Sequence, residues 1–185
     1  MSPLFRREAG VPAEVLTRAG LSGERVLAHA VAADGTWLLG TRDALFVVEP
    51  ADTRRIAWEH VQSADWVRDD DRFRVVEVAP YGEQQPVHTH EIVEPTRLLQ
   101  LVRERVTASV VLSRRVRLPN RRHLTVIGRR PPRGTGALSE TVTWAYDLEP
   151  GVDPSDPAVR EAAEAALRSA QEELGLGPGT AGRPI

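Results

Sequence analysis

The chain has 185 residues, of which 41% are apolar and 27% charged, and its formal net charge is −2. These values are typical of a globular protein that buries one core, or one core and a smaller unit. Cysteine and lysine are both absent, which excludes disulfides, thiolate nucleophiles, cysteine-bound zinc and lysine-based catalysis.

All 24 basic residues are arginine, a bias that indicates a G+C-rich, actinobacterial type of source. No apolar run approaches the roughly 18 residues that a membrane-spanning helix needs. Arg6 and Arg7 are not followed by the apolar stretch of an export signal. We therefore expect a cytoplasmic protein.

Residues 1–24 form an N-terminal segment with one short helix candidate, residues 12–18. Pro12 suits the first helical position and Gly20 suits the position after the last turn. Val15 and Leu16 are its only good apolar anchors, so this helix needs another element to pack on.

Residues 25–108 alternate short apolar runs with turn-forming residues, which predicts an antiparallel meander closed by a helix. Asp34-Gly35 is the strongest hairpin signal, and the spacing of Ile56 and Trp58 predicts that Trp58 lies in the core. Strands are expected at residues 25–31, 37–40, 44–48, 55–61, 64–68, 72–78 and 86–92, and the helix at residues 95–106.

Residues 109–176 are expected to form a small second unit of three strands and a helix, followed by a flexible tail, residues 177–185. The strands are predicted at residues 109–118, 123–128 and 140–146, with a long loop at 130–136. The helix should begin with Ser155 or Asp156 as N-cap and end near Leu174, with an alanine-rich face. Strands followed by a helix, twice over, indicate an α+β protein.

One stretch of the meander resembles a known family. The text G-T-R-D-A-L-F-V-V followed by R-R-I-A-W-E-H-V-Q-S-A-D-W resembles bacterial pleckstrin-homology-like (PH-like) and GRAM-like domains, over roughly residues 25–109. The matching positions are Thr41, Leu45, Ile56, Trp58, Val61 and Ser63. The resemblance implies an antiparallel β-barrel or sandwich capped by its helix, with an interior filled by side chains.

The lipid-binding residues of eukaryotic pleckstrin domains do not carry over to this chain. Those domains use basic residues around the first hairpin, whereas residues 31–36 here contain Asp34 and no base. An anionic membrane surface is therefore not an expected partner.

The second unit opens with an arginine-rich hairpin that lacks acidic residues. We consider three partners for these arginines: acids of the C-terminal helix and of another protein, which we favour, phosphates of nucleic acid, or anionic lipid. The candidate binding residues are Arg114, Arg115, Arg117, Arg121, Arg122, Arg129, Arg130 and Arg133.

His88 and His90 are the only weak candidates for a metal site. Residues two apart on a strand share a face, so both rings can reach one ion, but the third ligand is missing unless Glu94 supplies it. The interpretation that we favour is two exposed histidines on an edge strand. We expect no metal, no cofactor and no catalytic residues.

These features favour a non-enzymatic cytoplasmic adaptor or accessory protein with a PH-like scaffold that binds another protein. The candidate contact regions are the arginine-rich hairpin and the N-terminal segment with Phe5, Arg6 and Arg7. Nucleic-acid or anionic-phosphate binding through residues 114–133 is one alternative, and a metal-dependent enzyme using His88 and His90 is the other. The sequence names neither a partner nor an oligomeric state.

Overall fold

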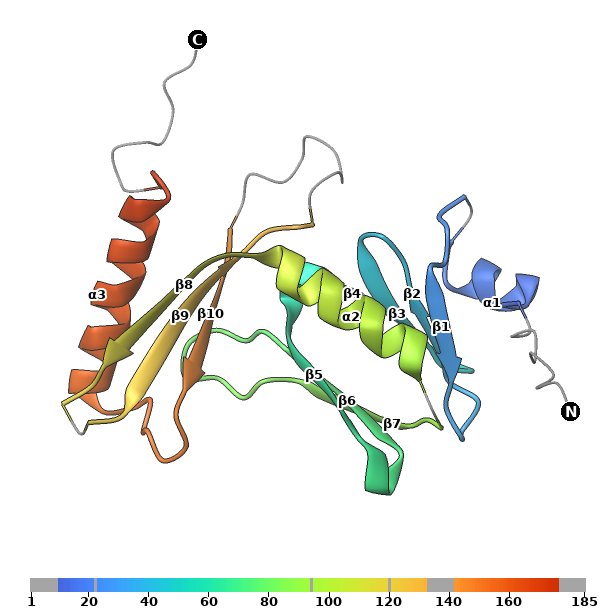
Figure 1. Ribbon diagram of the computed structural model, residues 1–185, viewed down its shortest axis with the longest axis horizontal. Coiled ribbons are helices and arrows are strands. Elements are labelled where there is room, and N and C mark those ends of the chain that lie inside the picture. Colours follow the sequence, from blue (N-terminus) through green and yellow to red (C-terminus); the bar gives the residue numbers. More distant parts are fainter. Residues whose placement is uncertain (1–9, 22, 94, 120, 133–141, 177–185) are drawn as a thin grey trace, which may run out of the picture.

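The computed structural model describes residues 10–21, 23–93, 95–119, 121–132 and 142–176. Within these residues the chain forms three antiparallel sheets and three α-helices, in an elongated arrangement with α1 near one end and α3 at the other (Figure 1). The α+β class expected from the sequence is confirmed. Among the described residues, no helix combines the length and the apolar character needed to cross a membrane.

The first sheet consists of four strands that pair in chain order. They are β1 (Ala28–Val31), β2 (Trp37–Gly40), β3 (Ala44–Val48) and β4 (Thr53–Ala57). The Asp34-Gly35 hairpin is confirmed: Gly35 has a φ of 85°, and the Asp34 carboxylate accepts a 2.9 Å hydrogen bond from the Thr36 N–H. The last strand of this first sheet ends earlier than predicted.

The predicted strand 55–61 is wrong in its second half. The chain leaves β4 at Ala57 and makes a 3₁₀ turn, Trp58–His60, before β5 (Val61–Val67). The Trp58 indole N–H donates to the Thr41 carbonyl at 3.3 Å, which holds the ring in this corner between the sheets. Trp58 is fully buried there, so its predicted core role is confirmed.

The second sheet contains β5, β6 (Arg72–Glu77) and β7 (Val87–Glu91), again in chain order. Strand pairing stays within each sheet of the described chain, so the closed barrel included in the prediction does not form. The nearest approach to closure is a single backbone hydrogen bond of 2.9 Å from the Ala33 N–H to the Glu91 carbonyl. The two sheets face each other as separate layers.

Helix α2 (Thr96–Ser109) completes the core between these two sheets. Its buried residues Leu98, Leu101 and Val102 belong to the same apolar cluster as Ile56 of the first sheet and Phe73 of the second. Gly40 of β2 lets the helix come close, because no side chain separates it from Leu101. As expected, side chains fill this interior.

Helix α1 (Ala13–Arg18) covers the outer face of the first sheet. Val15 packs with Leu39, Phe46 and Val48, in a cluster distinct from the main core. The short N-terminal helix thus has the packing partner that its sequence required.

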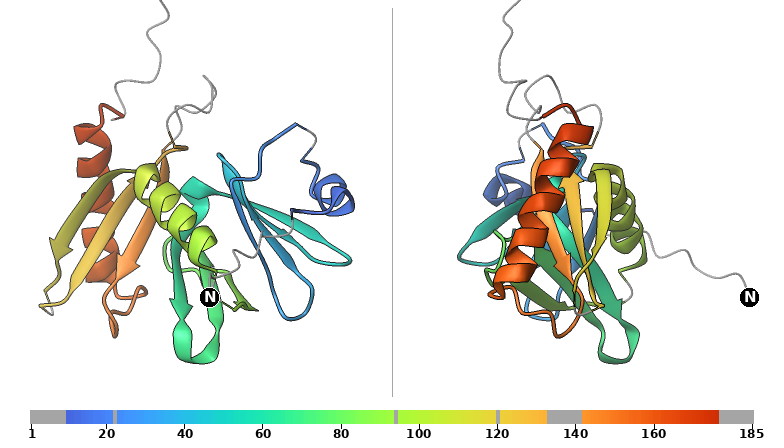
Figure 2. Two further views of the ribbon diagram at one scale, coloured as in Figure 1. Left: turned by 45° about the vertical axis from the view of Figure 1, so that its right-hand side comes forward. Right: turned by 90° about the vertical axis from the view of Figure 1, so that its left-hand side faces the viewer.

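The C-terminal unit has its own sheet and helix. Its strands β8 (Val110–Arg117), β9 (His123–Arg129) and β10 (Thr143–Leu148) pair in the order β10-β9-β8. Helix α3 (Pro157–Glu173) lies across one face (Figure 2), with Ala163 and Ala166 packed on that sheet. Asp156 is the N-cap and accepts from the Ala158 N–H at 2.8 Å. The predicted tail, residues 177–185, lies outside the described residues.

Gly40→Ala tests the close contact between α2 and the first sheet. A Cβ at this position would lie 2.5 Å from Leu101 Cδ2 and 3.3 Å from Leu98 Cδ1, both in the core. We expect the free energy of unfolding to fall by about 1–3 kcal/mol, measured by urea denaturation with tryptophan fluorescence. Gly10→Ala is the control, because a Cβ there meets nothing within 4 Å. Equal effects of the two substitutions would contradict this packing.

Candidate functional site

The arginines of β8 point to both faces of the C-terminal sheet. Arg114 shares a face with Leu112, which packs against α3, and its guanidinium pairs with the Glu173 carboxylate of that helix. Arg115 and Arg117 project from the opposite face, where Arg115 Nη2 lies 2.7 Å from Glu149 Oε1. The expected pairing with the C-terminal helix thus holds for Arg114, but neighbouring arginines diverge.

His123 is a second partner of the Glu149 carboxylate, in addition to Arg115. Glu149 Oε2 accepts a 3.0 Å hydrogen bond from the His123 backbone N–H, and Nδ1 of the His123 ring lies 3.0 Å from Glu149 Oε1. Partial desolvation alone would raise the pKa of Glu149, but these hydrogen bonds and that from Arg115 lower it. The carboxylate therefore stays charged opposite the arginine.

The remaining arginines of the hairpin have different surroundings. Arg121 is exposed in the tight turn after β8, with a φ of 65°, and the Arg122 guanidinium donates to the Pro150 carbonyl. Arg130 is half-buried, and Arg133 lies outside the described residues. The candidate arginines are therefore distributed over both faces of the sheet, one turn and the interior. They do not form one strip.

Arg129 is buried, with only 3% of its surface exposed. Its Nη1 donates to the Val106 carbonyl at 3.2 Å and to Ser109 Oγ at 3.0 Å, both at the end of α2. Its Nη2 donates to the Gln62 carbonyl of β5 at 3.1 Å. A residue that the sequence proposed as a binding contact therefore joins the C-terminal sheet to the first unit.

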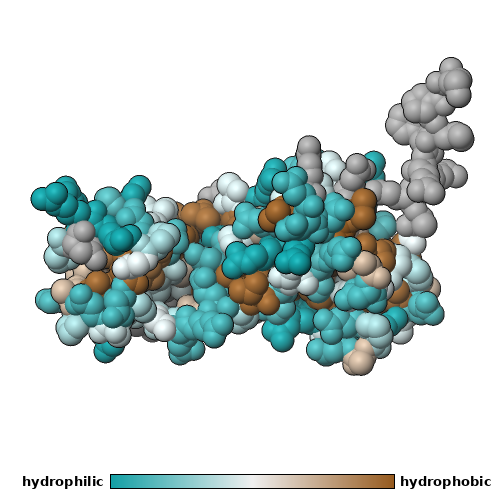
Figure 3. Space-filling view, turned by 90° about the horizontal axis from the view of Figure 1, so that it is seen from below, coloured by the Kyte–Doolittle hydropathy of each residue, from teal (hydrophilic) through white to brown (hydrophobic). Residues whose placement is uncertain are grey.

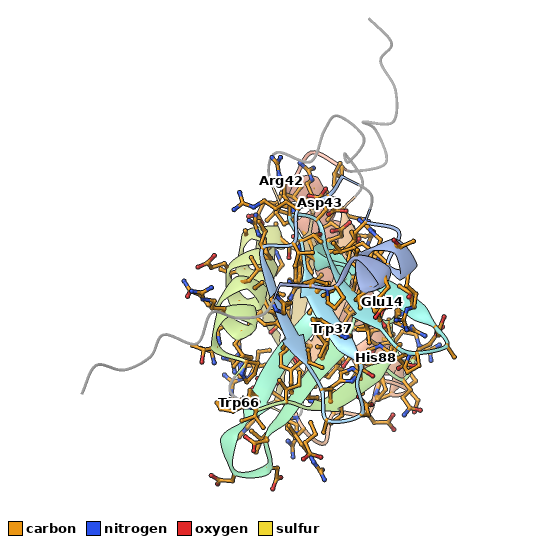
Figure 4. The ribbon with its side chains drawn as sticks, turned by 90° about the vertical axis from the view of Figure 1, so that its right-hand side faces the viewer. Glu14, Trp37, Arg42, Asp43, Trp66 and His88 are labelled. Atoms are coloured by element: carbon orange, nitrogen blue, oxygen red, sulfur yellow. The ribbon has the colours of Figure 1, made fainter. Side chains whose placement is uncertain are left out.

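The histidine pair lies on the inner face of the second sheet. His88 is paired with Val75 and His90 with Phe73, and both of these partners are core residues. The strand that carries them is an edge strand, as expected, but the prediction that both histidines are exposed is wrong, because this strand turns its even-numbered residues toward the interior. Figure 4 shows His88 away from the end of the sheets that carries Arg42 and Asp43.

The two histidines have unlike surroundings. His88 Nε2 lies 2.5 Å from Glu77 Oε1, which also receives Arg54 Nη1 at 3.3 Å. His90 is 8% exposed, and neither ring nitrogen has a hydrogen-bond partner within the described chain. Burial lowers the pKa of His90, while the charge of Asp34 opposes that shift. Within the described residues no group of three or more carboxylates and histidines is arranged to hold a metal, and Glu94 lies outside them.

A groove runs along the junction between the two units. Its main part, about 510 Å³, lies between the β6–β7 loop, β10 and the start of α3. An adjoining part of about 280 Å³ shares Tyr81, Tyr146 and Pro154 and continues along Asp147 and Leu148. We call both parts together the seam groove. The full lining of the main part is Tyr81, Gly82, Glu83, Tyr146, Pro154, Ser155, Arg160, Ala163 and Glu164.

Both tyrosines of the chain lie in the seam groove. Their rings meet edge to face with centroids 5.1 Å apart, and the Tyr81 hydroxyl donates to the Pro154 carbonyl at 3.1 Å. Burial raises the pKa of both hydroxyls, so they stay protonated at neutral pH. The sequence predicted no element or site between the strands at residues 72–78 and 86–92, although an aromatic residue in P-Y-G-E was the available signal.

The rim of the seam groove is polar and its floor apolar. Ala163 is buried beneath it and the two tyrosines are half-buried, whereas Glu83, Arg160 and Glu164 are exposed. Seen from below, the molecule presents a mostly hydrophilic surface with small apolar patches (Figure 3). An apolar floor inside a charged rim suits recognition of a ligand that has both apolar and charged parts.

Compared with known proteins, the chain matches no family model, no curated protein and no solved structure.

Replacing Arg129 by methionine should destabilise the fold. The substitution removes the donors of three hydrogen bonds: the Gln62 carbonyl loses the bond from Arg129 Nη2, and the Val106 carbonyl keeps only its 2.7 Å bond from Ser109 Oγ. We expect the free energy of unfolding to fall by at least about 2 kcal/mol in urea denaturation. Arg117→Met, at an exposed position of the neighbouring strand, should change it by no more than about 0.5 kcal/mol. Equal effects would show that Arg129 does not join the units.

His90 should make stability depend on pH. Because burial lowers its pKa below the usual 6.5, the unfolded chain binds a proton just below that pH that the folded chain does not. The free energy of unfolding should therefore fall as the pH falls below about 6.5. The measurement compares wild type with His90→Leu at about pH 7.5 and about pH 5. Wild type should lose more stability than the variant, and equal losses would contradict a buried neutral His90.

Proposed function

We propose that this chain is a non-enzymatic cytoplasmic adaptor or accessory protein that binds another protein through the seam groove. The observation that carries the proposal is the groove itself, where the two tyrosines and a charged rim meet at the junction of the units. Its main part has the size of the clefts that proteins use to hold a ligand or a few residues of a partner.

A PH-like scaffold for the first unit is part of the proposal. Four strands, then three strands, then a helix follow one another in the order that the resemblance implies. Two of the motif residues also meet in space: the Thr41 carbonyl accepts a 3.3 Å hydrogen bond from the Trp58 indole N–H. The motif thus acts as a packing corner, which supports the resemblance at the level of fold.

The position of the polar residues favours binding over the two alternatives. The only titratable pair proposed for metal chemistry faces the core, with His90 almost inaccessible to a substrate. The phosphate alternative requires converging arginines, whereas Arg114 and Arg115 lie on opposite faces and each has a carboxylate partner. The seam groove keeps exposed polar groups around a formed hollow, as a recognition surface requires.

Site-directed photo-crosslinking in cells of the source organism tests this function. A photo-reactive phenylalanine derivative replaces Glu83, which lines the groove, or Thr107, an exposed position at the end of α2. We expect one discrete protein adduct from position 83 and none from position 107, detected by immunoblot and mass spectrometry. Adducts from position 107 alone, or none from either position, would overturn the seam groove as the binding surface.

A further inference from the structure

We propose that the seam groove accepts an arginine side chain from an extended segment of the partner protein. This inference rests on the proposed function and specifies its ligand. The group that the groove recognises is a guanidinium. It lies against the tyrosine rings on one side and the carboxylates of the rim on the other.

The charge around the groove favours a cation. Three carboxylates line its two parts, Glu83, Asp147 and Glu164, against one lining guanidinium, that of Arg160. Glu164 also has an exposed partner outside the groove, Arg168 Nη1 at 3.9 Å, and such exposed pairs are weak. A cationic group entering the groove therefore meets an excess of negative charge, whereas an anion is repelled.

The start of α3 does not reverse this preference. A helix N-terminus attracts anions through its unpaired N–H groups, and Ser155 and Arg160 lie beside it. Here the chain supplies such an anion itself, because the Asp156 carboxylate caps the helix and accepts from the Ala158 N–H at 2.8 Å. The positive end of the helix is thus already matched by a carboxylate.

Aromatic rings beside carboxylates select a guanidinium among the biological cations. A guanidinium stacks on aromatic faces and forms paired hydrogen bonds with a carboxylate, and it gives up its hydration more easily than an ammonium group. Tyr81 and Tyr146 supply the rings, and Glu83 and Glu164 supply acceptors on the rim. The adjoining part, about 280 Å³, continues along Asp147 and Leu148 and offers space for the chain next to such a residue.

The test uses three blocked pentapeptides, Gly-Pro-X-Pro-Gly, in which X is arginine, its uncharged isostere citrulline, or glutamate. Each is titrated into the full-length ¹⁵N-labelled protein and followed by amide chemical shifts. We expect the arginine peptide alone to shift amides of residues 81–83, 146–148 and 153–164. Equal shifts with citrulline or glutamate, or arginine-dependent shifts confined to another surface, would overturn the proposal.

Charge variants separate recognition from a structural effect. Glu83→Gln with Glu164→Gln should weaken binding of the arginine peptide roughly threefold to tenfold, because each removes one rim carboxylate. Arg160→Gln should tighten binding up to about fivefold, a gain that damage to the fold cannot produce. Glu161→Gln is the matched control, since it removes a carboxylate from the same helix outside the groove and should leave the affinity unchanged.

The outcomes distinguish this inference from the proposed function. If the arginine peptide fails to bind while position 83 still crosslinks to a partner, the guanidinium is wrong and the groove remains the binding surface. If position 83 gives no adduct and the peptide fails to bind, both proposals are wrong. An unchanged affinity in Arg160→Gln and in the double variant would also refute the electrostatic basis of the inference.

Discussion

The buried guanidinium of Arg129 fixes how the two units of this chain meet. The apolar clusters of the two units are separate except for Tyr81, which packs against a cluster of the C-terminal unit, so apolar packing alone leaves their relative orientation weakly determined. Arg129 lies on β9, yet its donors reach carbonyls of α2 and β5, and the Arg130 N–H donates to the Ser109 carbonyl beside them. The negative end of the α2 dipole favours a cation at this place, which offsets part of the cost of burying it.

The seam groove is a consequence of that junction. Neither unit forms it alone, because Tyr81 comes from the β6–β7 loop and Tyr146 and Pro154 come from the C-terminal unit. The hydrogen bond from Tyr81 to Pro154 is a second connection across the same seam, at the far side of the C-terminal sheet from α2. Polar contacts at both places therefore hold the seam groove, and its shape depends on the angle between the units.

Local patterns in the sequence predicted most elements, because hairpin turns, helix caps and apolar spacing act over a few residues. Asp34-Gly35 and the Asp156 cap are examples, and both occur in the structure. The break at Trp58 was missed because alternation continues through it, and only the bond to Thr41, seventeen residues away, explains the corner. The burial of Arg129 and His90 and the meeting of the two tyrosines depend on long-range packing, which no local pattern records.

A chain whose only basic residue is arginine makes local basic density a poor indicator of a phosphate-binding surface. The planar guanidinium has five donors and sheds water readily, so it serves equally in ion pairs, in turns and in the interior. Within one hairpin, Arg114 pairs with a helix carboxylate, Arg122 donates to a loop carbonyl and Arg129 is buried between units. Charged groups of either sign are almost never fully buried without a partner, so what decides their role is whether that partner lies within the chain. Arg114, Arg122 and Arg129 of the hairpin each have such a partner, whereas the exposed Glu83 lies at the rim of an apolar hollow. On this reasoning the acidic rim of the seam groove, rather than the arginine-rich hairpin, is the better basis for a proposal about a partner.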